Sequence, residues 1–319
     1  MKINIAFPTK PATYGGVGTF QKNISSYFLS QGYSVSHGTI DKNKHNVILV
    51  MGGTKRLLWL LKNKIKGVPI IHRLDGKNWQ HRLQNFGLLY FIKSEIRLNI
   101  LKIIRKYFSN GIIYQSKFIR DWWQSNDIVI KPSVVINNGT FSNKLNNDEK
   151  SHDVICVEGE LNGKPAYSIL DNIKDFKVNV LGGYDANYNF QNNINMLGKV
   201  SKEKVHKLFK DSKIFVNLET NPPCPNSMIE ALSHGLPIIS INNGSASEII
   251  GDAGILIEQE NDPWQYDTPK DLSNIDKYIK HILENYDNYH SKAIERYEKK
   301  FTMEHVGKLY ENFIKSFVR

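Results

Sequence analysis

The sequence has very little cysteine. Its 319 residues contain only Cys156 and Cys224, which lie far apart and show no metal-ligand spacing. Two such residues provide neither the disulfide framework of small secreted domains nor a zinc site. We therefore expect free thiols and a protein of the reducing cytoplasm.

Long hydrophobic runs are also missing. No stretch approaches the ~20 apolar residues that span a bilayer as a helix. Residues 1–9 alternate apolar and polar side chains, which is typical of a strand rather than of a signal peptide. These absences predict a cytoplasmic protein that is soluble or peripheral at the inner membrane face.

Motifs of several enzyme classes are absent as well. There is no Gly-x-Ser-x-Gly elbow, no His-Glu-x-x-His and no Cys–His pairing at metal spacing, which argues against those hydrolases and zinc enzymes. The glycine-rich loop of residues 15–18 lacks the third glycine of a dinucleotide fingerprint and is not a P-loop. We expect neither a metal nor a bound cofactor.

Acidic residues are outnumbered by basic ones, 31 to 42, which leaves a formal net charge of +11. Much of the excess lies in two amphipathic helical patterns, residues 55–66 and 86–108. Such patterns are typical either of helices at a membrane interface or of core helices with a solvated charged face, and we favour the core helix. Nucleic-acid binding ranks last, because no recognition motif accompanies the charge.

A regular alternation of β-rich runs and helical patterns is present throughout. It predicts parallel sheets covered by helices on both faces. Strands are expected at residues 2–7, 33–36, 47–51, 69–73, 111–114 and 133–136, then at 154–157, 177–181, 194–197, 214–217, 237–240 and 254–257. The polar stretch 137–151 divides the chain into domains of residues 1–140 and 141–300, each near the ~150 residues of an ordinary domain.

The most informative segment is residues 221–248. A strand that ends near Leu218 leads through a proline-rich turn into a helix, whose first N–H groups can bind phosphate. Glu230 lies about one turn into this helix, where a carboxylate can accept hydrogen bonds from ribose hydroxyls. An isolated glutamate would be better interpreted as a solvated acid favoured by the helix dipole, but Glu230 is part of a longer pattern.

This segment closely resembles the donor-binding motif of retaining GT-B glycosyltransferases of family 4, the glycosyl transferases group 1. The resemblance covers residues 217–248 and extends to residue 257. It implies two doubly wound Rossmann-like α/β domains that face a cleft, with the last helix, residues 301–319, crossing back to the first domain. It also implies transfer of a sugar from a nucleotide-diphosphate sugar, with retention and without a metal.

The resemblance assigns donor-binding roles by position. Glu230 matches the ribose-binding glutamate, and Lys199 lies in the strand-end turn beside the nucleotide base. The backbone amides that hold the diphosphate match those of three successive residues, Asn226, Ser227 and Met228.

Two positions depart from the family pattern. Pro222 stands where the first acid of the motif belongs, which leaves Glu219 as the candidate catalytic carboxylate near the transferred sugar. Glu160 stands where relatives carry an arginine, whereas Lys164 matches the lysine that neutralises the leaving diphosphate. Three residues of the first domain are candidates to supply the missing positive charge: Arg73, Lys77 and Arg120.

The first domain carries candidates of its own. Gly16 and Gly18 lie in a loop that resembles the glycine loop of the family, which approaches donor and acceptor. Asp75 follows a strand at the edge of the sheet that faces the cleft, where relatives usually have a histidine, and is the leading catalytic candidate of this domain. For Ser116 we favour a helix cap, and for Asn138 a turn.

These observations predict a glycosyltransferase of surface-polysaccharide or glycoconjugate assembly, with a UDP-sugar favoured over a GDP-sugar as donor. Its partners would be the nucleotide sugar, a glycan or lipid-linked acceptor, and a membrane surface contacted through the basic amphipathic helices. The departures at Pro222 and Glu160 keep open a catalytically weak or inactive nucleotide-sugar-binding subunit. Epimerisation of a nucleotide sugar is a third alternative.

Overall fold

The computed structural model describes residues 3–13, 15–84, 86–141, 150–161, 164–259, 264 and 271–318, without the side chains of residues 160, 164 and 165. The chain divides into two compact units. Unit 1 comprises Met1–Phe141 and Thr302–Arg319, and unit 2 comprises Ser142–Phe301. The domain boundaries predicted from the sequence, residues 140 and 300, each lie one residue earlier.

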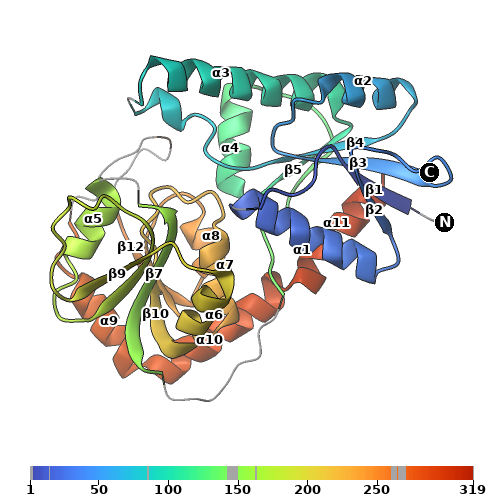
Figure 1. The fold of residues 1–319 in the computed structure, drawn as a ribbon. Helices are drawn as coiled ribbons and strands as arrows, with labels where there is room; N and C mark the ends of the chain where they lie inside the picture. The colour runs from blue at the N-terminus through green and yellow to red at the C-terminus, as the bar shows by residue number, and fades with distance from the viewer. Residues whose placement is uncertain are drawn as a thin grey trace. The chain divides into compact units, whose positions relative to one another are not determined.

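Unit 1 is built on a sheet of six parallel strands in the order β2-β1-β3-β4-β5-β6 (Figure 1). The strands are β1 (Ile3–Phe7), β2 (Ser34–His37), β3 (His45–Met51), β4 (Ile70–Leu74), β5 (Gly111–Tyr114) and β6 (Ser133–Val135). The helical segments are α1 (Gly16–Ser30), α2 (Leu57–Ile65), the 3-10 turn η1 (Gln80–Arg82), α3 (Leu88–Ile103), the π-helical turn η2 (Ile104–Phe108), α4 (Lys117–Asn126) and α11 (Met303–Lys315).

Helices cover both faces of this sheet, because successive residues of a strand point to opposite sides. On one face, Ile5 shares a buried cluster with Phe20 of α1. On the other face, Ile48 shares a buried cluster with Leu60 of α2 and Ile104 of η2. Burial on both faces explains why these strands read as nearly continuous apolar runs.

The last helix, α11, packs on unit 1. The backbone N–H of Met303 donates to the carbonyl oxygen of Thr140 (2.8 Å). Tyr310 is fully buried in the same cluster as the residues of β1 and α1. The hydroxyl of Tyr27 donates to the carboxylate of Glu311 (3.2 Å). The predicted return of the last helix to the first domain is therefore confirmed.

Unit 2 has a second sheet of six parallel strands, in the order β12-β11-β10-β7-β8-β9. The strands are β7 (His152–Glu160), β8 (Val178–Gly183), β9 (Ile194–Gly198), β10 (Ser212–Val216), β11 (Ile238–Ile241) and β12 (Gly254–Ile257). The helices are α5 (Lys164–Asp171), α6 (Lys202–Asp211), α7 (Asn226–Ser233), α8 (Ala246–Ile250), α9 (Ile275–Glu284) and α10 (Tyr286–Lys300). Helices α5 and α9 cover one face of the sheet, and α6, α7 and α10 cover the other.

The predicted class of two doubly wound α/β domains is confirmed, because both sheets are parallel and carry helices on both faces. Every expected strand is present and overlaps its predicted range. Within the described ranges, no helix combines the length and the apolar character needed to cross a membrane.

The preferred interpretation of residues 86–108 as a core helix is wrong for much of α3. Leu98 and Leu101 are buried, but Leu88 is 74% exposed and Ile96 is 55% exposed. The helix has two apolar stripes, and only one of them faces the sheet. Its sequence pattern gives the period of the apolar residues but not the number of stripes that packing covers.

Candidate functional site

The carboxyl edge of the unit 2 sheet contains a topological switch point between β7 and β10. From β7 the chain adds β8 and β9 on one side, and it then returns to place β10 on the other side. In open parallel sheets, ligands bind in the crevice outside the strand ends at such a point. We therefore expect a ligand site at the segments that follow β7 and β10.

The segment after β10 is a strained turn that leads into α7. Two non-glycine residues have positive φ there, Asn221 (50°) and Cys224 (146°). Such conformations cost free energy and cluster at ligand sites. Helix α7 then begins at Asn226 after Pro225, which provides no side-chain cap. The first turn of α7 therefore presents backbone amides of the kind that bind phosphate.

The three residues predicted to bind a diphosphate occupy this first turn. Asn226 and Ser227 are half-buried, whereas the side chain of Met228 is fully buried in the apolar core of unit 2. Met228 can therefore offer a ligand its backbone but not its side chain. The helix ends as the sequence predicts, with Gly235 at φ 71° and its N–H donating to Leu232 (2.9 Å).

Glu230 lies on α7 with only 9% of its surface exposed. Burial raises the pKa of its carboxyl group, and the nearby charge of Lys202 opposes that rise. The Nζ atom of Lys202 lies 3.9 Å from Oε1 of Glu230. A carboxylate in this position costs free energy in the unliganded protein, and hydroxyl groups of a ligand would offset that cost.

Lys202 connects the α7 site to the end of β9. It is the first residue of α6, directly after Ser201, whose side chain accepts a hydrogen bond from Lys204 N–H (3.3 Å). Lys199, the predicted base-turn residue, follows Gly198 at the end of β9. The structure thus brings the β9–α6 turn beside Glu230. The sequence analysis did not single out Lys202, although its place after a helix-capping serine was visible.

The turns after β10 and β11 are locked together. Asn221 N–H donates to Oδ1 of Asn243 (2.9 Å), and Ser245 N–H donates to the carbonyl oxygen of Pro222 (2.7 Å). A Cβ atom at Gly244 would lie 2.4 Å from backbone atoms of both Asn221 and Pro222. Pro222, at the position of the missing acid, is buried in this contact.

Glu219 lies at the start of the same turn. Its carbonyl oxygen accepts a hydrogen bond from the side chain of Asn217 (3.0 Å), and its own side chain is half-buried. This placement keeps Glu219 within the segment after β10, where the sequence analysis expects a carboxylate near the sugar. The role itself stays a prediction.

The segment after β7 contains the predicted Lys164. Strand β7 ends at Glu160, and α5 begins at Lys164. The side chains of both residues lie outside the described part of the structure. Their proposed effects on a diphosphate therefore remain predictions.

In unit 1, the glycine loop lies at the end of β1. Gly15 has φ 93°, and Gly16 begins α1. A Cβ atom at Gly18 would lie 2.4 Å from the carbonyl oxygen of Ala12. Gly18 thus has a packing reason to be glycine, whereas Gly16 is exposed at the first turn of α1. The ligand roles of both glycines stay predictions.

Asp75 follows β4 and is held by a buried arginine. Nη1 of Arg73 lies 2.5 Å from Oδ2 of Asp75, and Nη2 donates to Asn138 (2.5 Å) and Gln115 (3.1 Å). Burial raises the pKa of the Asp75 carboxyl group, and Arg73 opposes that rise. A Cβ atom at Gly52 would lie 2.9 Å from Oδ1 of Asp75, so the end of β3 also approaches this carboxylate closely.

This network changes two interpretations. Arg73 is only 1% exposed, and its guanidinium binds three side chains. It therefore does not replace the arginine that relatives carry at the position of Glu160. The turn predicted at Asn138 is not present, and its side chain instead helps to hold Arg73. The predicted cap at Ser116 is confirmed, since its side chain accepts from Ile119 N–H (3.3 Å).

The described residues contain few candidate metal ligands that lie close together. No group of three or more His, Cys, Asp or Glu side chains there is placed to hold a metal ion. Cys156 and Cys224 are buried and are not joined to each other in a disulfide.

A known protein family matches most of unit 2. The family described as glycosyl transferases group 1 matches residues 177–300, a range that includes β9, α6 and α7. The resemblance of residues 217–248 to glycosyl transferases group 1 is thereby confirmed, whereas retention and membership of family 4 stay predictions. No curated protein sequence matches the chain.

Solved structures resemble the whole chain. A sucrose-phosphate synthase from Thermosynechococcus elongatus matches with a TM-score of 0.72 at 13% identity, over 99% of this chain and 100% of that one. HepE from Anabaena, solved in complex with UDP, has a TM-score of 0.69 at 13% identity, over 99% of this chain and 100% of that one. TarM from S. aureus, also solved with UDP, has a TM-score of 0.63 at 18% identity, over 84% of this chain and 55% of that one. These likenesses confirm the GT-B fold.

Proposed function

Because the chain carries a glycosyl transferases group 1 domain on a GT-B fold, we propose that it transfers a sugar from a nucleotide-diphosphate sugar to an acceptor hydroxyl group. The acceptor is a glycan or a lipid-linked saccharide, and the reaction serves surface-polysaccharide or glycoconjugate assembly in the cytoplasm. The two buried cysteines, which form no disulfide with each other, support a reducing compartment.

The observation that carries this proposal is the environment of Glu230. A glutamate that is 9% exposed beside Lys202 has a position that folding alone does not favour. It lies one turn beyond the amide groups of Asn226 and Ser227, so a ribose at Glu230 leaves the diphosphate at the helix N-terminus. We assign Glu230 to the ribose and the first turn of α7 to the diphosphate.

The chemistry proposed is substitution at the anomeric carbon with retention. The bond from that carbon to the diphosphate breaks, the acceptor oxygen bonds to the same carbon, and the hydroxyl proton passes to the departing diphosphate. The α7 amides and Lys164 stabilise the developing negative charge, which replaces a metal ion in this role. Asp75 and Glu219 orient sugar hydroxyls, and Gly16 and Gly18 let the backbone approach the donor.

We favour a uridine-diphosphate sugar as the donor, so that uracil is the base that the protein binds. HepE and TarM, which share the fold, were each solved with UDP. We assign the base to the β9–α6 turn, where Lys199 follows Gly198.

A catalytically weak or inactive nucleotide-sugar-binding subunit is the second candidate. Pro222 occupies the position of an expected acid, and its backbone is fixed by Ser245 and by close contact with Gly244. A carboxylate therefore cannot reach the sugar from that position. The donor site at Glu230 would remain intact in such a protein.

Sugar transfer tests these alternatives directly. The protein is incubated with a panel of UDP-sugars and GDP-sugars and with alkyl glycosides as acceptors, and release of nucleoside diphosphate is measured. We expect acceptor-dependent release of UDP and a product whose anomeric configuration, read by NMR, matches that of the donor. Glu230→Gln should lower kcat/KM by about tenfold to a hundredfold, the loss of one or two charge-assisted hydrogen bonds. Nucleotide binding without acceptor-dependent release would favour the second candidate.

A further inference from the structure

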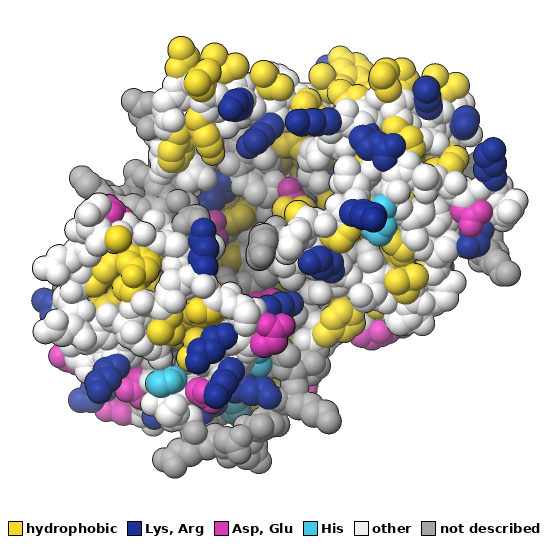
Figure 2. Space-filling view, in the orientation of Figure 1, with side chains coloured by type: hydrophobic (Ala, Val, Ile, Leu, Met, Phe, Trp, Pro, Cys, Tyr) yellow, Lys and Arg dark blue, Asp and Glu magenta, His cyan; other side chains and the backbone are white. Residues whose placement is uncertain are grey.

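The outward faces of α2 and α3 expose an unusual amount of apolar surface. We call this the α2–α3 surface. It consists of large apolar side chains that are 38–77% exposed, namely Leu58, Leu61, Ile65, Leu88, Leu89, Ile92, Ile96, Ile103 and Tyr107. Figure 2 shows hydrophobic side chains along the α2 and α3 side of unit 1, with Lys and Arg beside them. Exposed apolar patches of this extent mark interaction sites.

The exposed residues of α3 form a stripe of their own. Leu88, Ile92 and Ile96 follow one another at four-residue spacing and therefore lie on one side of the helix. Leu98 and Leu101 lie on another side and are buried against unit 1. Packing thus fixes the helix through one stripe and leaves the other exposed.

The two helices are tied into one platform. Nζ of Lys64 on α2 donates to the carbonyl oxygens of Tyr107 (2.6 Å) and Phe108 (3.1 Å) in η2, which continues α3. Nζ of Lys131 binds the carbonyl oxygens of Arg105 (2.9 Å) and Ser109 (2.7 Å). The exposed stripes of α2 and α3 therefore belong to one surface that hydrogen bonds hold together.

The charge of this region is strongly one-sided. Residues 55–66 and 86–108 contain ten lysines and arginines, of which Arg105 is buried and paired with Asp127, and a single acidic residue, Glu95. Glu95 is already neutralised, since Arg82 donates to both of its oxygens (2.5 and 2.9 Å) and His81 lies 2.7 Å away. Lys93 and Arg97 are exposed on α3, each one residue beyond an apolar member of the stripe. Their long side chains can keep their charges in water while the stripe is buried.

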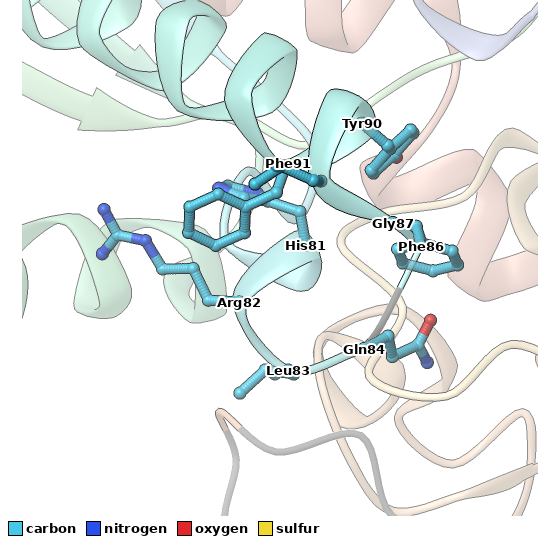
Figure 3. Close-up of a pocket in the computed structure, with 9 residues that line it drawn as sticks. His81, Arg82, Leu83, Gln84, Phe86, Gly87, Tyr90 and Phe91 are labelled. Carbon is cyan, nitrogen blue, oxygen red and sulfur yellow. The ribbon is translucent and has the colours of Figure 1, made fainter.

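An open cavity of about 510 Å³ adjoins the start of α3. Its walls include Leu83, Phe86, Leu88 and Phe91, and Phe91 packs against the ring of His81 (Figure 3). The cavity adjoins the end of the exposed stripe, and its lining also includes His81, Arg82 and Gln84. It offers room for part of a chain such as a fatty acyl tail.

We propose that the α2–α3 surface binds the surface of an anionic lipid bilayer, with both helices lying in the plane of the interface. An apolar stripe bordered by basic side chains is the pattern that interfacial helices share. The exposed leucine and isoleucine side chains enter the boundary between headgroups and acyl chains, while the lysines and arginines contact anionic headgroups. A second copy of the chain fits this surface poorly, because pairing would bring two strongly basic faces together.

Vesicle flotation tests the proposal with the full chain. Vesicles of equimolar phosphatidylcholine and phosphatidylglycerol should carry the protein upward at low salt, and vesicles of phosphatidylcholine alone should carry much less. The triple variant L88Q/I92Q/I96Q should lose at least about tenfold in partition, because the inserted apolar side chains are gone. The pair K93E/R97E should lose at least about tenfold on the anionic vesicles and little on the neutral ones.

Matched variants separate this surface from general effects. K277E/K280E makes the same charge change on the exposed side of α9, and Leu29→Gln removes an exposed leucine from α1. Both should float like the wild type. UDP-induced thermal stabilisation should be unchanged in every variant, so failure of flotation and failure of the donor site are read separately. The proposal is overturned if the wild type does not float with anionic vesicles, if the triple variant floats equally well, or if light scattering shows a dimer that the triple variant abolishes.

Discussion

Arg73 shows how one buried residue organises the strand ends of unit 1. Its guanidinium binds Asp75 after β4, Gln115 after β5 and Asn138 after β6, and it lies over the ring of Phe20 at 4.5 Å from the centroid. The sequence analysis considered Arg73 only as a ligand for a diphosphate. Gln115 and Asn138 lie 42 and 65 residues from Arg73 in the sequence. The sequence alone therefore could not predict this network.

Arg73→Met should destabilise unit 1 by about 3–5 kcal/mol, because it leaves the buried Asp75 carboxylate and two amide oxygens without their partner. Urea unfolding followed by tryptophan fluorescence measures this, since four of the five tryptophans belong to unit 1. Arg120→Met is the matched control, because the Arg120 side chain is 36% exposed and pairs with its neighbour Asp121. It should stay within about 0.5 kcal/mol of the wild type. Equal effects of the two variants would contradict the role given to Arg73.

Glu230 should make the stability of the unliganded protein depend on pH. Burial raises the pKa of its carboxyl group above the ordinary value of 4.5. The folded state therefore holds this proton more tightly than the unfolded state does. The resulting stability is fully present below pH 4.5 and is lost as the pH rises through the higher pKa of the folded state.

Glu230→Gln should consequently raise the Tm of the unliganded protein at pH 8, and the difference from the wild type should shrink toward pH 4. Thermal scans across this pH range provide the measurement. Glu284→Gln removes an exposed glutamate of α9 and serves as the control. A Glu230→Gln variant that is less stable than the wild type at pH 8 would show that the carboxylate is a structural group rather than a strained ligand site.

Among the elements, the contact between the turns after β10 and β11 shapes the start of α7. Gly244 has φ 57°, and a Cβ atom there would meet the backbone at 2.4 Å. Gly198 has a similar φ of 67°, but a Cβ atom at that position would have no neighbour within 4 Å. The two glycines therefore separate backbone strain from steric contact.

Gly198→Ala should cost about 1–2 kcal/mol, the ordinary penalty for a left-handed residue other than glycine. Gly244→Ala should cost clearly more, because the backbone of Asn221 and Pro222 must also move. Thermal unfolding compares the two variants, and UDP titration should show weaker binding in Gly244→Ala. If both variants lose the same stability, the close contact does not hold the turn.

The sequence predicted the elements better than their surroundings. The strands could be predicted because strands buried on both faces form short apolar runs. Turn residues such as Gly, Pro and Asn separate these runs. The candidate site at α7 could be proposed from the sequence because its residues are contiguous, from Pro222 to Glu230. An exposed stripe on α3 was the less favoured of two interpretations, because a sequence pattern cannot say which of two apolar stripes is buried. Lys202 was missed because its proximity to Glu230 depends on how β9 and α7 meet in space.

For the whole molecule, the return of α11 completes the core of unit 1. Residues 302–319 contribute Tyr310, Val306 and Ile314 to a cluster formed otherwise by residues 3–136. Tyr33 also donates its hydroxyl hydrogen to Glu311 of α11 (2.7 Å). The last helix is therefore part of the first domain in its packing, although the whole second domain separates them in sequence.

Tyr310→Ala should destabilise unit 1 by about 3–5 kcal/mol, the usual cost of removing a large buried aromatic side chain. Its neighbour Leu309 is 39% exposed on the same helix, and Leu309→Ala should cost about 1 kcal/mol or less. Urea unfolding followed by tryptophan fluorescence compares them. A small effect of Tyr310→Ala would mean that unit 1 holds together without α11.

The nucleotide site itself is tested most directly by thermal unfolding of the wild type and of Glu230→Gln with UDP, GDP, ADP or CMP. UDP at 100 times its dissociation constant should stabilise the wild type by about 2.7 kcal/mol, a shift of a few degrees. Glu284→Gln should respond like the wild type, and Glu230→Gln should lose at least about half of the stabilisation, because a tenfold weaker site keeps only about 1.4 kcal/mol at the same UDP concentration. If no nucleotide stabilises the wild type, or if Glu230→Gln responds to UDP as strongly as the wild type, the donor site does not lie at the start of α7.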